Sequence, residues 1–247
     1  MTALAASFSA TGRKSPGNPG TFFMKFYPLE KIVLEIDGQA EKFLNGVTSN
    51  SLDRPQNAFL DIHGRIVASF EQIKIKSEKY LIAIEKKFYD TLMQHLDKFI
   101  KLGGVRFLKT DYRVFFNLAG GYQNSADEYV IPQRKGELIF TGKNLTADVS
   151  PAEFTLFRLK NHIPLQGVDY AHEMILNVDE NEMVSYTKGC FLGQEFVSKV
   201  YSRSKPSWKL LVRREDECTP EEKQKMTSGT FDPDTGQVLG FVFVANH

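Results

Sequence analysis

The stretch Lys-Gly-Cys-Phe-Leu-Gly-Gln-Glu at residues 188–195 is the most informative part of this 247-residue chain. It holds Cys190 between Gly189 and Gly193, two residues after Lys188. Glycines have no side chain to pack and permit unusual backbone angles, which is typical of a loop that passes close to a ligand. The nearby lysine cation favours the reactive thiolate form of the cysteine. The alternative is an inert, buried thiol in a glycine turn, the usual fate of a free cysteine.

The sequence around this stretch, residues 185–195, resembles the signature of the YgfZ-like folate-binding proteins. These proteins are relatives of the aminomethyltransferase (T-protein) of the glycine cleavage system. The family usually has tyrosine where this chain has Phe191, so the departure is a missing hydroxyl group. The early tryptophan of the family falls near Lys31, which is not aromatic. Further family-like segments follow in the same order along the chain, at residues 41–48, 59–66, 163–164 and 238–241.

The resemblance implies a tetrahydrofolate-binding accessory protein for iron–sulfur cluster assembly or repair. Such a protein would support cluster-dependent enzymes, including those that thiomethylate tRNA. Cys190 would be the essential thiol, as nucleophile, redox group or transient cluster ligand, and Lys188 would keep it ionised. The residues expected to bind tetrahydrofolate or a derivative are Gly189, Gly193, Gln194, Glu195 and Arg203. If a helix begins at Gly193, Glu195 also suits the positive end of its dipole.

Two other functions stay open. The first is a folate-dependent one-carbon transferase with an unknown acceptor. An aminomethyltransferase needs an aspartate base in the strand after its glycine hairpin, where this chain has Ala68 and Ser69. Neither side chain is a carboxylate, so glycine cleavage is not expected and enzymatic activity is left undecided. The second is an RNA-binding module, because residues 185–214 carry seven basic residues against one acid, and such a stripe attracts anions.

Composition excludes several classes of protein. Hydrophobic residues make up 42% of the chain and charged residues 25%, as in ordinary soluble globular proteins. No apolar run approaches the ~20 residues that span a bilayer. Two cysteines exclude a secreted disulfide scaffold and favour a reducing compartment. We therefore expect a cytoplasmic protein, without a metal site and as a monomer. The resemblance implies folate and iron–sulfur client or assembly proteins as partners, and RNA stays a possible one.

The N-terminal residues 1–21 have too little apolar surface to fold and are expected to form a flexible tail. They contain no acidic residue, and a mitochondrial transit peptide is the alternative, which would place the protein in the matrix.

Hydrophobic periodicity predicts a strand from Lys31, a turn at Asp37-Gly38 and a short helix that buries Phe43. Longer helices are predicted over 87–102, before two glycines, and from Pro151 to about Asn161. The remaining predicted strands cover residues 57–62, 65–70, 73–75, 80–84, 105–107, 112–118 and 137–140.

This order of elements predicts an α+β fold with an antiparallel or mixed sheet and helices on one face. The resemblance adds that residues 22–205 form an aminomethyltransferase-like, folate-binding domain and residues 206–247 a small β-barrel. About forty residues are few for a barrel. We therefore expect a reduced one, packed on the first domain because it cannot form its own core.

Overall fold

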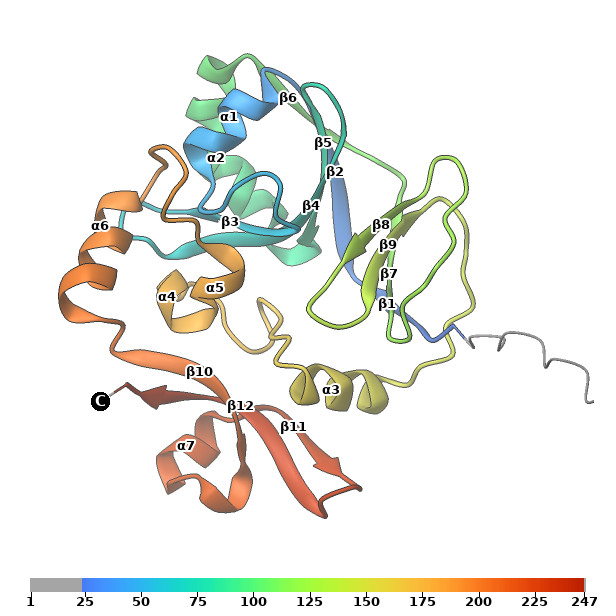
Figure 1. The fold of residues 1–247 in the computed structure, drawn as a ribbon, viewed down its shortest axis with the longest axis vertical. Helices are drawn as coiled ribbons and strands as arrows, with labels where there is room; N and C mark the ends of the chain where they lie inside the picture. The colour runs from blue at the N-terminus through green and yellow to red at the C-terminus, as the bar shows by residue number, and fades with distance from the viewer. Residues whose placement is uncertain (1–23, 247) are drawn as a thin grey trace, which may run out of the picture.

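The computed structural model describes residues 24–246, which form three antiparallel sheets with helices packed around them (Figure 1). The first sheet has five strands in the order β3-β4-β5-β2-β6. The second has four, in the order β1-β7-β9-β8, and the third has three, in the order β10-β12-β11. The expected α+β class is confirmed.

The five-stranded sheet owes its two buried faces to the alternation of side chains along its central strand. The strands are β2 (Lys31–Gly38), β3 (Gln56–Leu60), β4 (Ile66–Lys76), β5 (Lys79–Glu85) and β6 (Val105–Lys109). In β2, Leu34 and Ile36 face a cluster with the two helices α1 (Ala40–Val47) and α2 (Tyr89–Gly103), which cover this side. Val33 points to the opposite side, against the second sheet. The period-two pattern therefore predicted this strand correctly.

The four-stranded sheet packs against the other face of the first one. It consists of β1 (Phe26–Leu29), β7 (Arg113–Asn117), β8 (Tyr129–Pro132) and β9 (Glu137–Thr141). Its core joins Phe116 and Phe140 to Leu81 of the first sheet and to Phe154 of helix α3 (Pro151–Lys160). Strands β1 and β8 were not predicted, because each has only four residues and contains a proline.

Short helical segments connect α3 to the third sheet. They are α4 (Ile175–Val178), α5 (Glu180–Met183), α6 (Gln194–Lys199) and a π-helical turn, η2 (Val200–Ser204). The third sheet then contains β10 (Trp208–Arg214), β11 (Thr227–Asp232) and β12 (Gln237–Ala245). Single-turn helices η1 (Lys86–Phe88) and η3 (Glu215–Glu217) and the short helix α7 (Pro220–Lys225) complete the chain.

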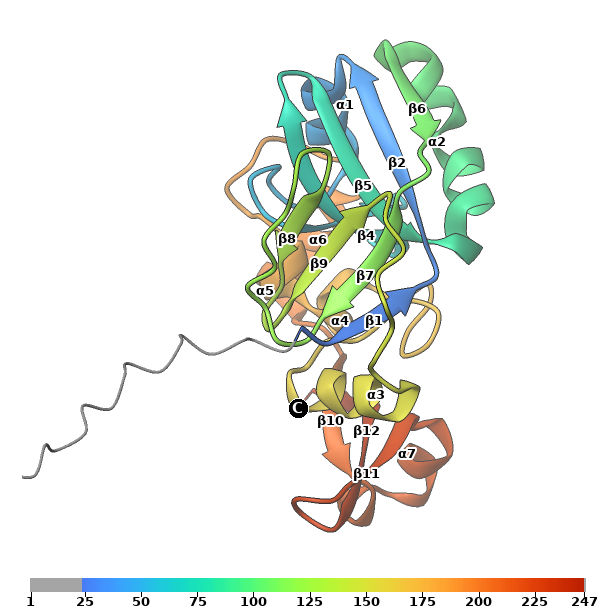
Figure 2. The same ribbon diagram turned by 90° about the vertical axis from the view of Figure 1, so that its right-hand side faces the viewer.

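The expected reduced C-terminal barrel is not closed, because residues 206–246 form an open three-stranded sheet. Three strands are too few to curl into a closed barrel. The chain between β10 and β11 forms the helices η3 and α7 and adds no further strand. The sheet lies at the end of the molecule, below the other two (Figure 2). It buries Leu210 and Phe241 against Ile66, Ile175 and Val197, so it shares a core with the preceding chain.

Polar contacts also fasten the third sheet to α3. The buried Arg158 guanidinium donates to Asp169 Oδ2 over 2.6 Å and to Ser228 Oγ over 2.8 Å. Lys160 Nζ lies 2.7 Å from Asp232 Oδ1. The domain limits at 22–205 and 206–247 stay a prediction, and the expected tail at 1–21 lies outside the described residues. No helix within residues 24–246 is both long and apolar enough to cross a membrane.

Candidate functional site

Two of the family-like segments, residues 41–48 and 59–66, lie against the loop that carries Cys190, although they are far from it along the chain. Lys188 Nζ donates to Thr48 O over 2.6 Å and to Asn50 O over 2.9 Å. The backbone N–H of Leu192 donates to Gly46 O over 3.0 Å. On both sides of the cysteine, the loop is therefore bound to the last turn of helix α1 or to the segment that follows it.

A buried polar network holds the acceptor segment in place. Asn50 Nδ2 donates to Gln56 O over 2.9 Å and to Glu182 O over 2.7 Å. Its backbone N–H donates to Asn57 Oδ1 over 2.7 Å. Because buried polar groups are costly when they lack a partner, this network specifies one backbone path. That path orients the Thr48 and Asn50 carbonyl groups toward Lys188.

Gly193 brings the loop into direct contact with the β3–β4 hairpin. Its φ is +83°, and a Cβ atom there would lie 2.4 Å from the carbonyl oxygen of Asp61. The Asp61 carboxylate accepts from the backbone N–H groups of His63 and Arg65 over 2.8 and 2.9 Å and so caps the turn. Position 193 therefore requires glycine, because the backbone of Asp61 leaves no room for a side chain. Gly189 has open space around its Cα and no left-handed φ.

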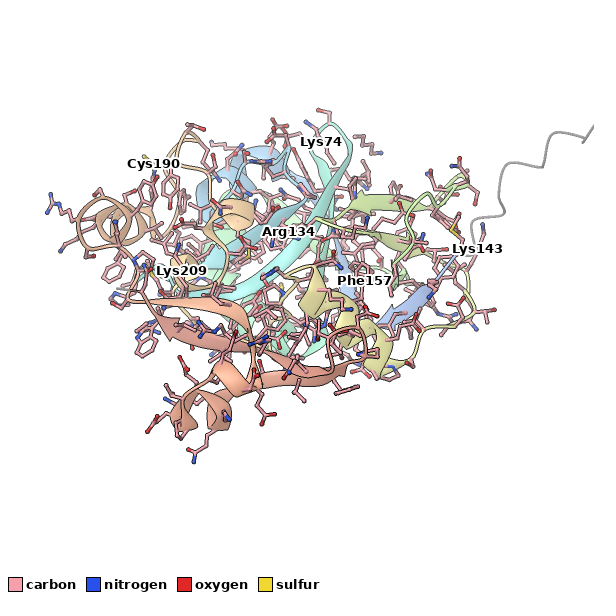
Figure 3. All side chains as sticks on the ribbon, turned by 60° about the horizontal axis from the view of Figure 1, so that its bottom comes forward. Lys74, Arg134, Lys143, Phe157, Cys190 and Lys209 are labelled. Atoms are coloured by element: carbon pink, nitrogen blue, oxygen red, sulfur yellow. The ribbon has the colours of Figure 1, made fainter. Side chains whose placement is uncertain are left out.

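Cys190 is an exposed free thiol at the edge of a groove. The groove has a volume of about 480 Å³ and lies between α1, the C-terminal end of α2 and the loop itself. Phe99 and Leu102 contribute apolar surface that is 37% and 89% exposed. Figure 3 shows Cys190 at the periphery of the molecule, on the side of Lys209 and opposite Lys143. The other lining residues include Gln39, Lys42, Phe43 and Phe191.

Burial lowers the pKa of Lys188 to about 8, because no carboxylate compensates for the loss of water. Its ammonium group also lies 5.3 Å from the ring centroid of Phe191, which is buried in the core. The described hydrogen bonds of Lys188 run to backbone carbonyls rather than to Cys190. Lys188 thus anchors the loop, and its effect on the thiol stays a prediction.

None of the other predicted site residues lines the groove. Helix α6 begins at Gln194 with Gly193 as its N-cap, as expected, and Glu195 lies exposed in the first turn. Gln194 Oε1 accepts from the backbone N–H of Phe191 over 3.2 Å, so this atom stabilises the loop. Arg203 is exposed on the π-helical turn. Their roles in ligand binding stay predictions.

A second cavity, of about 50 Å³, is buried between the first two sheets. Lys31 Nζ lies there 3.0 Å from Glu71 Oε2 and 3.0 Å from Glu85 Oε1. Burial opposes protonation of this lysine, yet the two carboxylates overcome it and raise its pKa above the ordinary value. The cluster joins three adjacent strands, since Lys31 pairs with Glu85 in the register of β2 and β5 and Glu71 lies on β4.

Sequence reasoning missed this charged cavity, although it correctly found no carboxylate at positions 68 and 69. Ala68 is buried beneath the helices, and Ser69 faces the cavity, where its Oγ lies 2.8 Å from Tyr170 Oη. Glu71 shares the face of Ser69 because side chains alternate along a strand. The available signal was an isolated acid inside the apolar run of β4.

Arg134 closes one side of the same cavity. Its Nη2 donates to Asp179 Oδ2 over 2.7 Å and lies 3.4 Å from Glu182 Oε1. Burial raises the pKa of Asp179 against the opposing effect of the arginine. Figure 3 places Arg134 between the side of the molecule that carries Cys190 and the side that carries Lys143.

No protein-family model matches this sequence, and no curated protein matches it by sequence. Comparison of structures does give a match. The fold is similar to that of the glycine cleavage system aminomethyltransferase T from Bartonella henselae, with a TM-score of 0.64 over 90% of this chain and 78% of the other. The two are 11% identical in sequence. The chain therefore has an aminomethyltransferase-like fold.

Proposed function

We propose that this chain is a tetrahydrofolate-binding accessory protein that supports the assembly or repair of iron–sulfur clusters through Cys190. The observation that carries the proposal is the exposed thiol at the edge of a groove of about 480 Å³. The fold and the signature-like sequence agree with it. The clients are cluster-dependent enzymes such as those that thiomethylate tRNA, and the protein acts on them as a monomer.

The groove suits the pterin better than the buried cavity does. A cavity of roughly 150 Å³ holds a single benzene ring, so the cavity beside Lys31, at about 50 Å³, cannot hold a two-ring heterocycle. The groove has room for one, with Phe99 as an apolar wall and Gln39 and Lys42 as polar partners. Lys42 would also attract the carboxylates of a folate tail.

The other cysteine, Cys218, differs from Cys190 in its exposure and serves as an internal control. Cys218 is 8% exposed, burial raises the pKa of its thiol, and its Sγ donates to Arg214 O over 3.2 Å. Cys190 is exposed, and both cysteines are free. Free thiols persist in a reducing compartment, so we propose the cytoplasm as the site of action. A thiol reagent should modify Cys190 at least about tenfold faster than Cys218, because reaction requires access and thiolate.

Calorimetric titration with tetrahydrofolate tests where the ligand binds. Phe99→Ala and Lys42→Ala should weaken binding roughly tenfold, whereas Glu71→Gln in the cavity and Lys101→Ala elsewhere on α2 should leave it unchanged. If Glu71→Gln abolished binding and Phe99→Ala had no effect, the pterin would be assigned to the cavity instead of the groove. Absence of binding by the unmodified protein would remove the folate part of the proposal.

Complementation tests the thiol. In cells that lack this protein, the unmodified chain should restore the activity of a cluster-dependent enzyme and Cys190→Ser should not. The variant should still bind tetrahydrofolate, since the thiol only borders the groove. Cys218→Ser is the matched control and should restore activity. Full restoration by Cys190→Ser would show that the thiol is not needed.

A folate-dependent one-carbon transferase is the second candidate, and one observation favours it. Glu71 and Glu85 put carboxylates into the cavity next to Ser69, although the aspartate of aminomethyltransferases is replaced. Turnover of a methylene- or formyl-folate by the purified protein, lost in Glu71→Gln, would support this activity. The same assay without turnover supports the accessory role.

A further inference from the structure

A third concave region lies at the other end of helix α6 and shares no lining residue with the Cys190 groove. We call it the Trp208 cleft. It has a volume of about 530 Å³ and lies where the β3–β4 turn, α6 with its π-helical turn, and the first residue of β10 meet. The residues that give it its character are His63, Arg65, Phe196, Ser204, Lys205 and Trp208.

Aromatic rings are exposed in this cleft. Trp208 is 48% exposed and Phe196 is 41% exposed, although large aromatic side chains dominate buried cores. The ring of His63 stands edge-on to Phe196, with 6.0 Å between the centroids and 87° between the planes. Exposed rings of this kind are stacking platforms, and every nucleobase has a face that can stack on them.

The charge of the cleft is positive. Arg65 and Lys205 line it, and none of its described lining residues is an aspartate or glutamate. Arg203 is exposed on the same π-helical turn. The neighbouring Asp61 is occupied by the backbone of its own turn and by His172 Nε2, which lies 3.2 Å from its Oδ2. In a chain of formal charge +1, this is a local concentration of cations suited to phosphate.

The lysine of the cleft is held in place by its backbone. Lys205 has φ +57° and ψ 160°, a region that glycine occupies far more readily than other residues, and it precedes Pro206. Its N–H donates to Val200 O over 2.7 Å. Pro206 is buried, and its carbonyl accepts from Asn246 Nδ2 over 2.9 Å. The backbone at this cation is therefore fixed on both sides.

The basic stripe predicted from residues 185–214 does not form one surface. Lys188 turns inward to backbone carbonyls, whereas Arg203 and Lys205 remain exposed near the aromatic rings. This second part combines exposed cations with the exposed aromatic side chains of the cleft. Stacking surfaces beside phosphate-binding cations are the requirements for binding single-stranded nucleic acid.

We propose that the Trp208 cleft binds single-stranded nucleic acid, with bases stacked on Trp208 and Phe196 and phosphates paired with Arg65, Arg203 and Lys205. This inference goes beyond the proposed folate-dependent function and uses none of the residues that line the Cys190 groove. RNA and DNA share the bases and phosphates that the cleft recognises, so the experiment compares both.

The chain contains one tryptophan, so its fluorescence reports directly on this cleft. Titration with a ten-nucleotide oligoadenylate, as RNA and as DNA, should quench Trp208 fluorescence. For three phosphate contacts, affinity should fall roughly 20-fold between 50 and 200 mM salt. Adenosine monophosphate should bind far more weakly, because it offers a single phosphate. A monophosphate that binds as tightly as the oligomer would overturn the proposal in favour of a free-nucleotide site.

Two variants test the two contributions separately. Phe196→Ala should weaken oligonucleotide binding about tenfold or more by removing one stacking surface. Lys205→Gly keeps the unusual backbone conformation accessible, so it should lower affinity and flatten the salt dependence without unfolding the protein. Lys74→Gln, at an exposed lysine far from the cleft, is the matched control. Equal affinities in all three variants, or no quenching by either oligomer, would refute the proposal.

Discussion

Two lysines that are partly or fully buried lie in different surroundings, one between the sheets and one under the Cys190 loop. Lys31, in the cavity between the sheets, is surrounded by two carboxylates that raise its pKa. Lys188, under the Cys190 loop, has only backbone carbonyls and an aromatic ring beside it, and its pKa falls to about 8. The same residue type therefore behaves oppositely in the two places, and the partners decide which way.

The two lysines also differ in the space that lies beside them. The Lys31 ammonium group lies between two carboxylates, beside a cavity of about 50 Å³. The loop at Lys188 uses its lysine to hold backbone, which leaves Cys190 free beside a groove of about 480 Å³. We infer that the first region maintains the fold and the second carries out the function.

Replacement of Lys31 should have the largest effect on stability. Lys31→Met leaves Glu71 and Glu85 buried without their cation, and breaking a buried pair in this way costs about 3–5 kcal/mol. Urea denaturation measures the free energy of unfolding. The control is Lys74→Met, whose partner Glu41 and own side chain are nearly half exposed, so its loss should stay below about 1 kcal/mol. Equal losses in the two variants would contradict a structural role for the cluster.

Replacement of Gly193 should have an intermediate effect. In Gly193→Ala, a left-handed φ and a Cβ atom 2.4 Å from Asp61 O should together cost roughly 1–3 kcal/mol. Gly189→Ala lies in open space and should change stability by less than about 0.5 kcal/mol. Thermal unfolding of the pair separates the two glycines. If Gly189→Ala proved the more damaging, the assignment of the close approach would be wrong.

The titration of Lys188 should appear as a change in the slope of stability against pH. Its pKa is about 8 in the folded protein and has an ordinary value of 10.5 when unfolded. Between these values the unfolded chain binds more protons, so the free energy of unfolding should rise with pH. Below about pH 8 the lysine is protonated in both states and contributes no slope. Subtracting the curve of Lys188→Met from that of the unmodified protein isolates this contribution, and a flat difference from pH 8 to 10.5 would contradict the lowered pKa.

Local patterns predicted the parts of the fold that depend on periodicity. The alternation in β2, the helical spacing of α2 before two glycines and the proline at the start of α3 all placed elements correctly. Strands β1 and β8 were not predicted, because a four-residue strand that contains a proline is too short to show a clear alternation. The expected barrel does not close. That expectation came from a resemblance, whereas the number of strands decides whether a sheet can close into a barrel.

The candidate site was only half visible in the sequence. The glycine–cysteine stretch identified the exposed thiol and the start of α6, because local backbone conformation depends on neighbouring residues in the sequence. The charged cavity and the Trp208 cleft were not visible, because each gathers residues from several distant segments.

The amino-acid sequence by itself determined which residues form strands and helices, where the glycine loop lies and which cysteine it presents. Those properties depend on neighbours along the chain. Only the tertiary structure decided that Lys31 lies beside carboxylates and Lys188 does not, and that Gly193 meets the turn at Asp61. The reason is that burial and electrostatic pairing depend on distance in space, and the partners of Lys188 are about 140 residues away along the chain.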